Sequence, residues 1–379
     1  MSLVLITGGA GFIGSHLTKK LLAGGHRVRI LDTLSPQIHG HVPAGLEWLR
    51  SEGVEFTRGT VTSLAEMKKA LAGAEVVVHL AAETGTGQSM YEIARYNEVN
   101  TGGTAVLLDV LANDPGRTVR RIVLASSRSI YGEGAYECPH CSAGTRRYPQ
   151  ARSREQLMGH HWEYACPDCG GELLPVTTQE NDPPRPGSIY AATKFAQEDL
   201  VRIGCSSLGI DFAILRLQNV YGEGQSLSNP YTGILSIFST RIRRSQHLPI
   251  FEDGMETRDF VHVHDVARAF VAAVQHDGAI NEVINVGTGI KTTVVDIASH
   301  LSRAFGAELD LVLTSEYRLG DIRHNFADIT RLESVLGIVP ELGTEAGMRR
   351  FASWVLTQDL PEDKLDRANA ELKARKLMG

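Results

Sequence analysis

Near its start the chain reads Leu3-Val4-Leu5-Ile6-Thr7-Gly8-Gly9-Ala10-Gly11-Phe12-Ile13-Gly14, an apolar run that leads directly into a glycine-rich turn. The run predicts a buried strand, and the pattern from Ile13 to Ala23 has the length of a helix. The glycines at positions 8, 11 and 14 have no Cβ to hold the backbone away from a ligand, and the first N–H groups of a helix attract an anion. This stretch therefore predicts a strand, a turn and a helix that bind the phosphates of a dinucleotide.

Asp32 follows the second apolar run, Val28-Arg29-Ile30-Leu31, and lies 18 positions beyond Gly14. In dinucleotide-binding folds, an acid about 20 residues after the glycine turn bonds the adenosine ribose hydroxyls. A carboxylate there repels a 2′-phosphate, so the sequence predicts NAD rather than NADP as the cofactor. The alternative is an ordinary solvent-exposed acid at the end of a strand.

Apolar runs and helix-length segments continue to alternate along the chain. The further expected elements are strands at 54–56, 76–80, 121–125, 212–215 and 283–286 and helices at 64–71 and 191–204. Runs that are apolar on both faces and separated by helices indicate a parallel sheet covered on both sides. The predicted fold class is α/β, a doubly wound Rossmann-type parallel sheet with a smaller C-terminal substrate lobe and an inserted four-cysteine segment.

The composition excludes several classes of protein. The chain has 379 residues, a formal net charge of −6, 42% hydrophobic residues and 22% charged residues, which rules out a disordered or collagen-like chain. The net negative charge argues against nucleic acid, which is bound by clustered Lys and Arg. The apolar runs are shorter than the about 20 residues of a membrane helix, and the first residues carry no basic leader. We therefore expect a cytosolic protein with no membrane or nucleic-acid partner.

Four of the five cysteines form two Cys-x-x-Cys pairs, Cys138 with Cys141 and Cys166 with Cys169, and 24 residues separate the pairs. Four thiolates on two tight turns can close a tetrahedral shell around zinc that leaves no position for a reacting water. The sequence thus predicts a structural Zn²⁺ in an inserted ribbon, with unligated thiols, a redox pair and an iron–sulfur cluster as alternatives. Cys205 stands alone in a predicted helix and is expected to be buried.

Five divisions of the chain are expected from these patterns. They are a dinucleotide-binding core at 1–136, the inserted zinc ribbon at 137–174, the rest of the core at 175–222, a mainly substrate-binding lobe at 223–360 with a strand returning to the core near 283–286, and a charged surface helix at 361–379.

Tyr190 and Lys194 lie four positions apart at the start of a predicted helix, so their side chains share one face. A free phenol has a pKa of about 10, and lowering the pKa to about 7 requires about 4 kcal/mol. One ammonium about 4 Å away supplies about that amount at an effective dielectric of about 20. The pair therefore predicts a tyrosine that acts as general base or acid. By itself, such a pair is also typical of an ordinary amphipathic helix.

These features occur together with a strand that ends Ala125-Ser126-Ser127. In this combination the chain resembles the extended short-chain dehydrogenase/reductase family, in particular its nucleotide-sugar 4-epimerases. The resemblance covers residues 1–355 apart from the cysteine segment. It implies tightly held NAD, a nucleotide-sugar substrate and a homodimer.

The resemblance also implies a role for each matching position. The implied catalytic residues are Ser127, Tyr190 and Lys194. The implied cofactor-binding residues are Gly8, Gly11, Phe12, Ile13, Gly14, Asp32, Leu80, Ala81, Ala82, Asn100, Tyr190 and Lys194. The implied substrate-binding residues, which hold the sugar, the diphosphate and the nucleotide, are Ser127, Asn219, Arg258, Arg318 and Asp321.

Two departures from the family pattern narrow the expectation. The 4,6-dehydratases of the family carry Asp-Glu after the catalytic residue, whereas this chain has Arg128-Ser129, so dehydration is disfavoured. Ser127 and Tyr190 are 63 positions apart, more than the family usually has, because the cysteine segment lies between them. Such an insert resembles a branch of the family that acts on dTDP-6-deoxyhexoses such as dTDP-L-rhamnose.

The expected activity is therefore NAD-dependent epimerisation at C4 of a nucleotide sugar, with a dTDP-sugar favoured. Tyr190, assisted by Ser127, would take the 4-hydroxyl proton while hydride passes from C4 to NAD⁺, and the 4-keto sugar would turn and take the hydride back on its other face. One alternative is an NAD(P)H-dependent 4-ketoreductase that uses the same residues. The other is a non-catalytic NAD-binding scaffold that binds a partner through the zinc ribbon.

Overall fold

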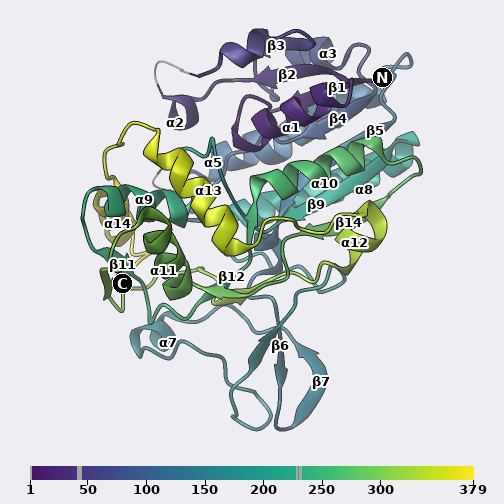
Figure 1. The fold of residues 1–379 in the computed structure, drawn as a ribbon. Helices are drawn as coiled ribbons and strands as arrows, with labels where there is room; N and C mark the ends of the chain where they lie inside the picture. Colours follow the sequence, from purple (N-terminus) through teal and green to yellow (C-terminus); the bar gives the residue numbers. More distant parts are fainter. Residues whose placement is uncertain (1, 41–44, 228, 230–232) are drawn as a thin grey trace.

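A seven-stranded parallel sheet forms the centre of the molecule (Figure 1). The computed structural model describes residues 2–40, 45–227, 229 and 233–379, and the other positions fall within the expected divisions 1–136 and 223–360. In spatial order the strands are β14 (Glu282–Val286), β9 (Asp211–Leu217), β5 (Arg121–Ser127), β4 (Val76–His79), β1 (Leu3–Thr7), β2 (Arg27–Asp32) and β3 (Val54–Arg58). Each coincides with a strand expected from the sequence, so the doubly wound α/β prediction is confirmed.

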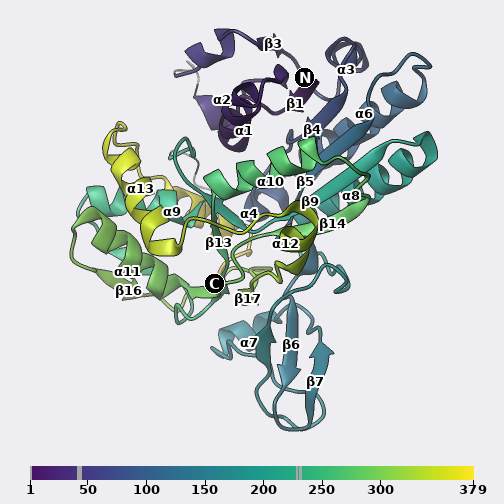
Figure 2. The same cartoon turned by 45° about the vertical axis from the view of Figure 1, so that its right-hand side comes forward.

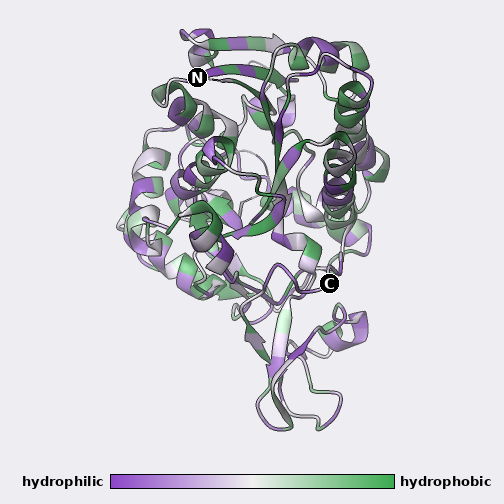
Figure 3. Cartoon of the chain, turned by 90° about the vertical axis from the view of Figure 1, so that its right-hand side faces the viewer, coloured by the Kyte–Doolittle hydropathy of each residue, from purple (hydrophilic) through white to green (hydrophobic). Residues whose placement is uncertain are grey.

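Helices cover both faces of this sheet, which Figure 3 shows between two helical layers. One face carries α1 (Phe12–Ala23), α10 (Val263–Gln275) and α12 (Thr330–Leu336), and the other carries α3 (Leu64–Leu71), α6 (Gly103–Ala112) and α8 (Ile189–Leu208). Val4 and Ile6 of β1 enter one core, whereas Leu5 enters the other. Because successive strand residues point to opposite faces, a strand that is apolar at every position needs an apolar layer on each side. No helix of the described ranges is long and apolar enough to cross a membrane.

A smaller lobe has an apolar core of its own (Figure 2). Its elements are α9 (Ile234–Arg243), β11 (Leu248–Ile250), α11 (Val294–Phe305), β16 (Leu311–Leu313) and α13 (Thr344–Leu356). Short sheets lie nearby and consist of β10 (Asn219–Tyr221) with β13 (Phe260–His262), and of β12 (Thr257–Arg258) with β15 (Thr292–Thr293) and β17 (His324–Asn325). Outside the cysteine segment, the remaining helices of the described chain are α2 (Pro36–His39), η1 (Glu47–Arg50), α4 (Thr86–Ser89), α5 (Ile93–Tyr96), η2 (Asn97–Gly102), η3 (Arg128–Tyr131) and α14 (Leu365–Ala374).

The cysteine segment between β5 and α8 projects from the body as a small ribbon (Figures 1 and 3). Its elements are β6 (Ala135–Cys138), β7 (Ser142–Arg147), α7 (Arg154–Met158) and β8 (Leu174–Val176). Its own buried cluster consists of Tyr136, Cys138, Tyr164, Cys166 and Leu173. So small a core does not stabilise a module by itself, so the ribbon depends on other contacts for its structure.

One buried ion pair and a half-buried cluster of charged and polar side chains join the ribbon to the lobe. Arg152 of the ribbon donates from Nη1 and Nη2 to the two carboxylate oxygens of Glu252, at 2.7 and 2.9 Å, and both side chains are buried. Glu163 accepts from Arg323 at 2.9 Å and is paired with His324 at 3.0 Å. These contacts fix the orientation of the ribbon relative to the body.

The variant Arg152→Met is expected to lower the free energy of unfolding by about 3 kcal/mol, because the buried Glu252 carboxylate loses two charge-assisted hydrogen bonds and keeps only the one from Arg323 at 3.1 Å. The urea unfolding midpoint measures this change. Glu345→Gln is the matched control, since the pair of Glu345 with Arg349 is exposed and such pairs contribute less than about 1 kcal/mol. Equal shifts for the two variants would show that the ribbon is not held by the buried pair.

Candidate active site

One cleft of about 1260 Å³ gathers most of the predicted site residues. It opens where the strands end, since Gly8 follows β1, Leu80 follows β4 and Ser127 ends β5. Ligands of doubly wound folds bind at this edge of the sheet. The predicted residues that line the cleft are Gly8, Gly11, Phe12, Ile13, Gly14, Asp32, Leu80, Ala81, Ala82, Ser127, Tyr190, Lys194, Asn219, Arg258, Arg318 and Asp321.

Asn100 is the one residue among the predicted catalytic, cofactor-binding and substrate-binding residues that does not line the cleft. It is buried, and it accepts a hydrogen bond from the Glu83 N–H at 2.7 Å. Its Nδ2 donates to the Glu83 carbonyl at 3.1 Å and to the Thr193 hydroxyl at 3.0 Å. Asn100 therefore positions the cleft-lining Glu83 segment from behind.

The glycine turn fits a close ligand. Gly8 has φ +69°, and a Cβ on it would lie 2.7 Å from the Ala81 nitrogen. A Cβ on Gly14 would overlap the Gly9 backbone. Gly11 is the N-cap of α1 and supplies no side-chain cap, so the first N–H groups of the helix are left for another acceptor. An anion at this helix start meets both the N–H groups and the helix dipole.

Asp32 ends β2 and lies in the cleft as predicted. Its Oδ2 accepts from the Ala10 N–H at 3.0 Å and its Oδ1 accepts from the Leu34 N–H at 2.8 Å. Each carboxylate oxygen has a second lone pair, so the backbone fixes the carboxylate and leaves it able to accept two ligand hydroxyls.

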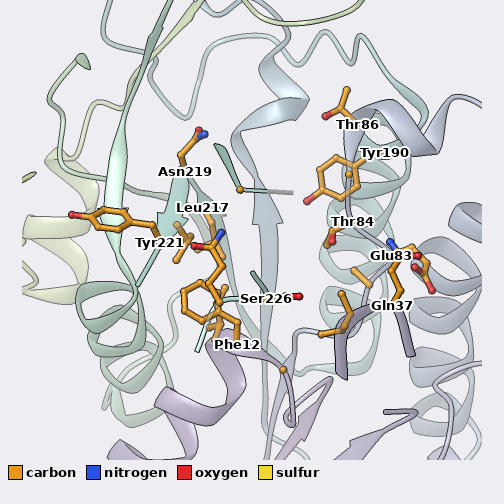
Figure 4. A pocket seen from close by; sticks show the side chains of 18 of the residues that line it. Phe12, Gln37, Glu83, Thr84, Thr86, Tyr190, Leu217, Asn219, Tyr221 and Ser226 are labelled. Carbon is orange, nitrogen blue, oxygen red and sulfur yellow. The ribbon is translucent and has the colours of Figure 1, made fainter. Parts of the chain in front are cut away.

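Tyr190 and Lys194 lie in the first turns of α8, as the sequence predicts. Ser188 caps the helix by accepting from the Ala191 N–H at 3.1 Å, and the Ser89 hydroxyl accepts from the Tyr190 N–H at 3.0 Å. Figure 4 shows the Tyr190 ring projecting into the cleft opposite Asn219. The two hydroxyl-bearing residues Ser127 and Tyr190 are thus brought to one cavity from elements on either side of the ribbon insert.

The expectation that Lys194 lowers the pKa of Tyr190 to about 7 is wrong. Burial raises the pKa of the Tyr190 phenol, and the Ser127 hydroxyl and the Arg128 charge lower it only in part. Burial also lowers the pKa of the Lys194 amine to about 7, and this amine donates to Gln197 Oε1 at 2.5 Å. Lys194 is therefore a weak source of charge, because the packing around it disfavours the ammonium form.

A buried hydrogen-bond chain, which no local sequence pattern indicates, continues from Lys194 into the sheet. Gln197 Nε2 donates to the Thr104 hydroxyl at 2.6 Å, and Thr104 donates to the Asn100 carbonyl at 2.7 Å. His79 Nε2 lies 3.0 Å from the same hydroxyl, and its Nδ1 lies 2.7 Å from the Thr7 hydroxyl. Burial lowers the pKa of His79 to about 3, so the imidazole is neutral. Because Thr104 donates its only hydroxyl proton to the Asn100 carbonyl, it accepts from His79 Nε2. These hydrogen bonds hold Lys194 in a fixed position in the lining of the cleft.

The other end of the cleft is rich in guanidinium groups. Arg258 donates to Asp321 Oδ1 at 3.2 Å and to the carbonyls of Thr257 and Arg323, each at 3.0 Å. Arg318 lies over the Phe251 ring, 4.6 Å from its centroid. Burial alone would raise the pKa of the Asp321 carboxyl, but the charges of Arg258 and Arg318 lower it overall. Two fixed guanidiniums with one carboxylate leave net positive charge for an anionic ligand.

A side chamber of about 370 Å³ adjoins this part of the cleft. The two cavities share Thr86, Arg128, Ser129 and Asp321 as lining residues. The lining of the chamber includes residues 149–151 of the ribbon, and Arg152 next to them donates to the Asp321 carbonyl at 3.2 Å. The ribbon therefore borders the side chamber that adjoins the cleft.

The C-terminal segment also borders the cleft, which corrects the expectation of a surface helix. Leu365, Ala368 and Leu372 of α14 are buried and line the cleft. Asn369 Oδ1 accepts from Arg318 Nη2 at 3.0 Å. The helix is charged on one side and apolar on the other. The apolar side packs across the cleft through long-range contacts that a local pattern does not reveal.

Leu372→Ala is expected to lower the free energy of unfolding by about 2 kcal/mol, the low end for a buried leucine, because one side of Leu372 faces the cleft. Leu356→Ala is the control, since Leu356 is 58% exposed and a surface change is expected to cost less than about 0.5 kcal/mol. Urea unfolding of both variants measures the two changes in the free energy of unfolding. A free helix on the surface would give the same small change for each.

The four paired cysteines are brought together at the tip of the ribbon. Their sulfurs all lie within 4.8 Å of one another, and three of the pairs are 3.5 Å apart. Sulfurs about 2.3 Å from a zinc ion lie about 3.8 Å apart in a tetrahedron. Backbone N–H groups of Cys141 and His140 lower the pKa of Cys138 to about 6, which favours the thiolate that binds metals. The arrangement fits a four-sulfur metal site, and Cys205 lies apart from it, buried as expected.

The sequence pattern of the NAD dependent epimerase/dehydratase family matches residues 4–155 and 167–287. A dTDP-L-rhamnose 4-epimerase from Burkholderia thailandensis is 38% identical over 370 residues, which cover 97% of this chain and 96% of that protein. The structure resembles the UDP-glucose 4-epimerase of Thermotoga maritima with UDP-glucose, at a TM-score of 0.74 and 28% identity, covering 93% of this chain and 98% of that one. It also resembles the UDP-glucose 4-epimerase of Thermus thermophilus complexed with NAD, at a TM-score of 0.71 and 26% identity, covering 94% and 100%.

The family match covers well over half of the chain, and the gap between its two matched stretches, 156–166, lies within the cysteine ribbon. The residues it spans include the glycine turn, Asp32, Ser127, Tyr190 and Lys194. The chain therefore belongs to the NAD dependent epimerase/dehydratase family.

Proposed function

We propose that the protein is an NAD-dependent nucleotide-sugar 4-epimerase whose favoured substrate is a dTDP-6-deoxyhexose such as dTDP-L-rhamnose. The observation that carries the proposal is that one cleft contains the glycine turn, the Ser127 and Tyr190 hydroxyls and two guanidiniums. The similarity to a dTDP-L-rhamnose 4-epimerase over nearly the whole chain supports the choice of sugar and nucleotide.

NAD would be held at the β1–α1 turn, with its ribose hydroxyls on Asp32. The backbone cradle fits it, since Gly8 and Gly14 leave no room for a side chain and α1 lacks a side-chain cap. When bound, NAD supplies reversible oxidation of the sugar at C4 by accepting and returning hydride. The carboxylate of Asp32 would exclude a 2′-phosphate by charge repulsion.

The residues of the chain would move the proton and hold the sugar. Tyr190 would take the proton of the 4-hydroxyl and return it to the 4-oxygen, and Ser127 would hold that oxygen in line. The raised pKa of Tyr190 keeps the phenol protonated at neutral pH, which is the form that donates. Ser127 and Arg128 lower the pKa of Tyr190 in part and so favour the phenolate, the form that takes the proton of the 4-hydroxyl.

The diphosphate would be bound by Arg258, Arg318 and Asn219, with Arg258 held in place by its bond to Asp321. Phosphate oxygens accept paired hydrogen bonds from guanidinium groups. Bound in this way, the nucleotide anchors the molecule while the 4-keto sugar turns about its link to the phosphate.

The four cysteines would hold a structural Zn²⁺. The support is the closeness of the sulfurs and the very small core of the ribbon. We also propose a homodimer, a cytosolic location and the five divisions of the chain. The separate apolar cores, two on the faces of the sheet and one in the lobe, support the division between core and lobe.

Incubation of the purified protein with dTDP-L-rhamnose, without added NADH, tests the function. Proton NMR should show a second dTDP-sugar that differs only in configuration at C4, and the mixture should reach one composition from either epimer. A strict, stoichiometric requirement for reduced cofactor would instead indicate a 4-ketoreductase. Binding of NAD with no conversion of any nucleotide sugar would indicate the scaffold alternative.

A further inference from the structure

Arg128 stands between the two cavities, directly after Ser127 in η3. Its side chain lines both the main cleft and the side chamber. Its Nε donates to the side-chain oxygen of Asn219 at 2.6 Å. Because the guanidinium is planar and rigid, this one bond fixes the direction in which the remaining N–H groups point.

The charge of Arg128 forms no ion pair within the described residues, although the charges of Asp321 and Asp259 act on it from further away. Within the part of the chain that the structure describes, no carboxylate lies within 4.0 Å of its guanidinium, and Nη1 is shielded from solvent without a hydrogen-bond partner. Arg258, in contrast, is bonded to Asp321 and to two carbonyls. Burial and the charge of Arg258 lower the pKa of Arg128 to about 9.

An unpaired, partly buried charge is destabilising, and proteins keep such groups mainly at functional sites. A ligand that brings oxygen atoms to the exposed side of the guanidinium would remove the penalty. The neighbours of Arg128 indicate which part of the ligand this is. Arg128 directly follows Ser127 in the chain, and the charge of Arg128 acts on the Tyr190 phenol. Arg128 therefore lies at the reacting end of the cleft.

We infer that Arg128 is a sugar-binding residue, which donates hydrogen bonds to oxygen atoms of the hexose at the mouth of the side chamber. The inference rests on the proposed function and extends it to the recognition of the sugar. Arg258 and Arg318 would bind the diphosphate, and Arg128, fixed by Asn219, would hold the hexose beside Ser127 and Tyr190. The side chamber supplies space next to Arg128 into which ring substituents turn.

Binding measurements with two ligands test this assignment. Calorimetry on wild type and on Arg128→Met would use dTDP-L-rhamnose and free dTDP, which lacks the sugar. We expect the Kd of the nucleotide sugar to rise at least about tenfold, the usual effect of losing a hydrogen bond to a charged group. The Kd of dTDP should change less than about threefold. Arg128→Lys keeps the positive charge and a hydrogen-bond donor, so it should bind the nucleotide sugar more tightly than Arg128→Met does.

Arg318→Met is the matched control, since it removes a guanidinium assigned to the diphosphate and should weaken both ligands alike. Equal weakening of both ligands by Arg128→Met would assign Arg128 to the diphosphate and overturn the inference. Unchanged binding of the nucleotide sugar would overturn it too. Thermal unfolding of each variant checks that the fold is kept. These binding measurements do not require turnover. If the wild type binds the nucleotide sugar without epimerising it, the proposed function is refuted, but the sugar-binding role of Arg128 is still tested.

Discussion

Tyr190→Phe should lower the rate of epimerisation by about a hundredfold to ten-thousandfold, the range for removal of a general acid or base. The phenol projects into the cleft from α8 and shares it with Ser127, and phenylalanine keeps the ring while removing the one proton that the mechanism moves. The Tyr190 backbone N–H still bonds to Ser89, so the helix start should remain in place. Steady-state turnover, measured by NMR on the nucleotide sugar, gives the size of the effect.

NAD content as purified provides the internal check, because the glycine turn and Asp32 do not involve the phenol. Tyr190→Phe should retain wild-type NAD content. Tyr148→Phe is the control substitution, since Tyr148 lies in the segment after β7 and donates to Asp182, away from the cleft. Its turnover should stay within about threefold of wild type. Full activity of Tyr190→Phe would remove Tyr190 from the mechanism.

Removal of the cysteine site should be the most destabilising change in the ribbon. Structural zinc contributes about 10–16 kcal/mol of apparent binding free energy in small zinc modules, whereas whole domains are stable by about 5–15 kcal/mol. The ribbon buries only five residues in its own cluster. Replacing Cys138 and Cys166 by serine should therefore unfold the ribbon and abolish metal binding.

Metal analysis by mass spectrometry and amide hydrogen exchange over residues 135–176 measure the two effects together. Wild type should contain one zinc ion per chain and show protected amides in β6 and β7. Cys205→Ala, which changes a buried cysteine outside the cluster, should keep the metal in full. A metal-free chain with unchanged protection would refute the zinc assignment.

The features that could be predicted are those written in short stretches of sequence. The glycines at 8, 11 and 14, with an apolar run before them and Asp32 after the next run, determine a local backbone path. Six of the seven strands have apolar residues facing both helical layers, and the edge strand β3 has them on one face. Such local patterns led to the sheet, to the turn and to the positions of Tyr190 and Lys194 on one helix.

The features that could not be predicted depend on residues far apart in the chain. Arg152 and Glu252 are 100 positions apart, and the bond from Arg318 to Asn369 brings the C-terminal segment to the cleft. The error over the pKa of Tyr190 has the same origin. Spacing alone placed a lysine near the phenol, but the burial of both groups and the bond of Lys194 to Gln197 depend on packing.

The central claim is that the hydrogen removed from C4 of the sugar returns to C4 while Tyr190 handles only the hydroxyl proton. A dTDP-sugar that carries deuterium at C4 tests it most directly. Incubated with the enzyme in ordinary water and without added cofactor, it should give the C4 epimer with the deuterium still at C4. Loss of the deuterium to solvent, or inversion only at another carbon, would contradict the account.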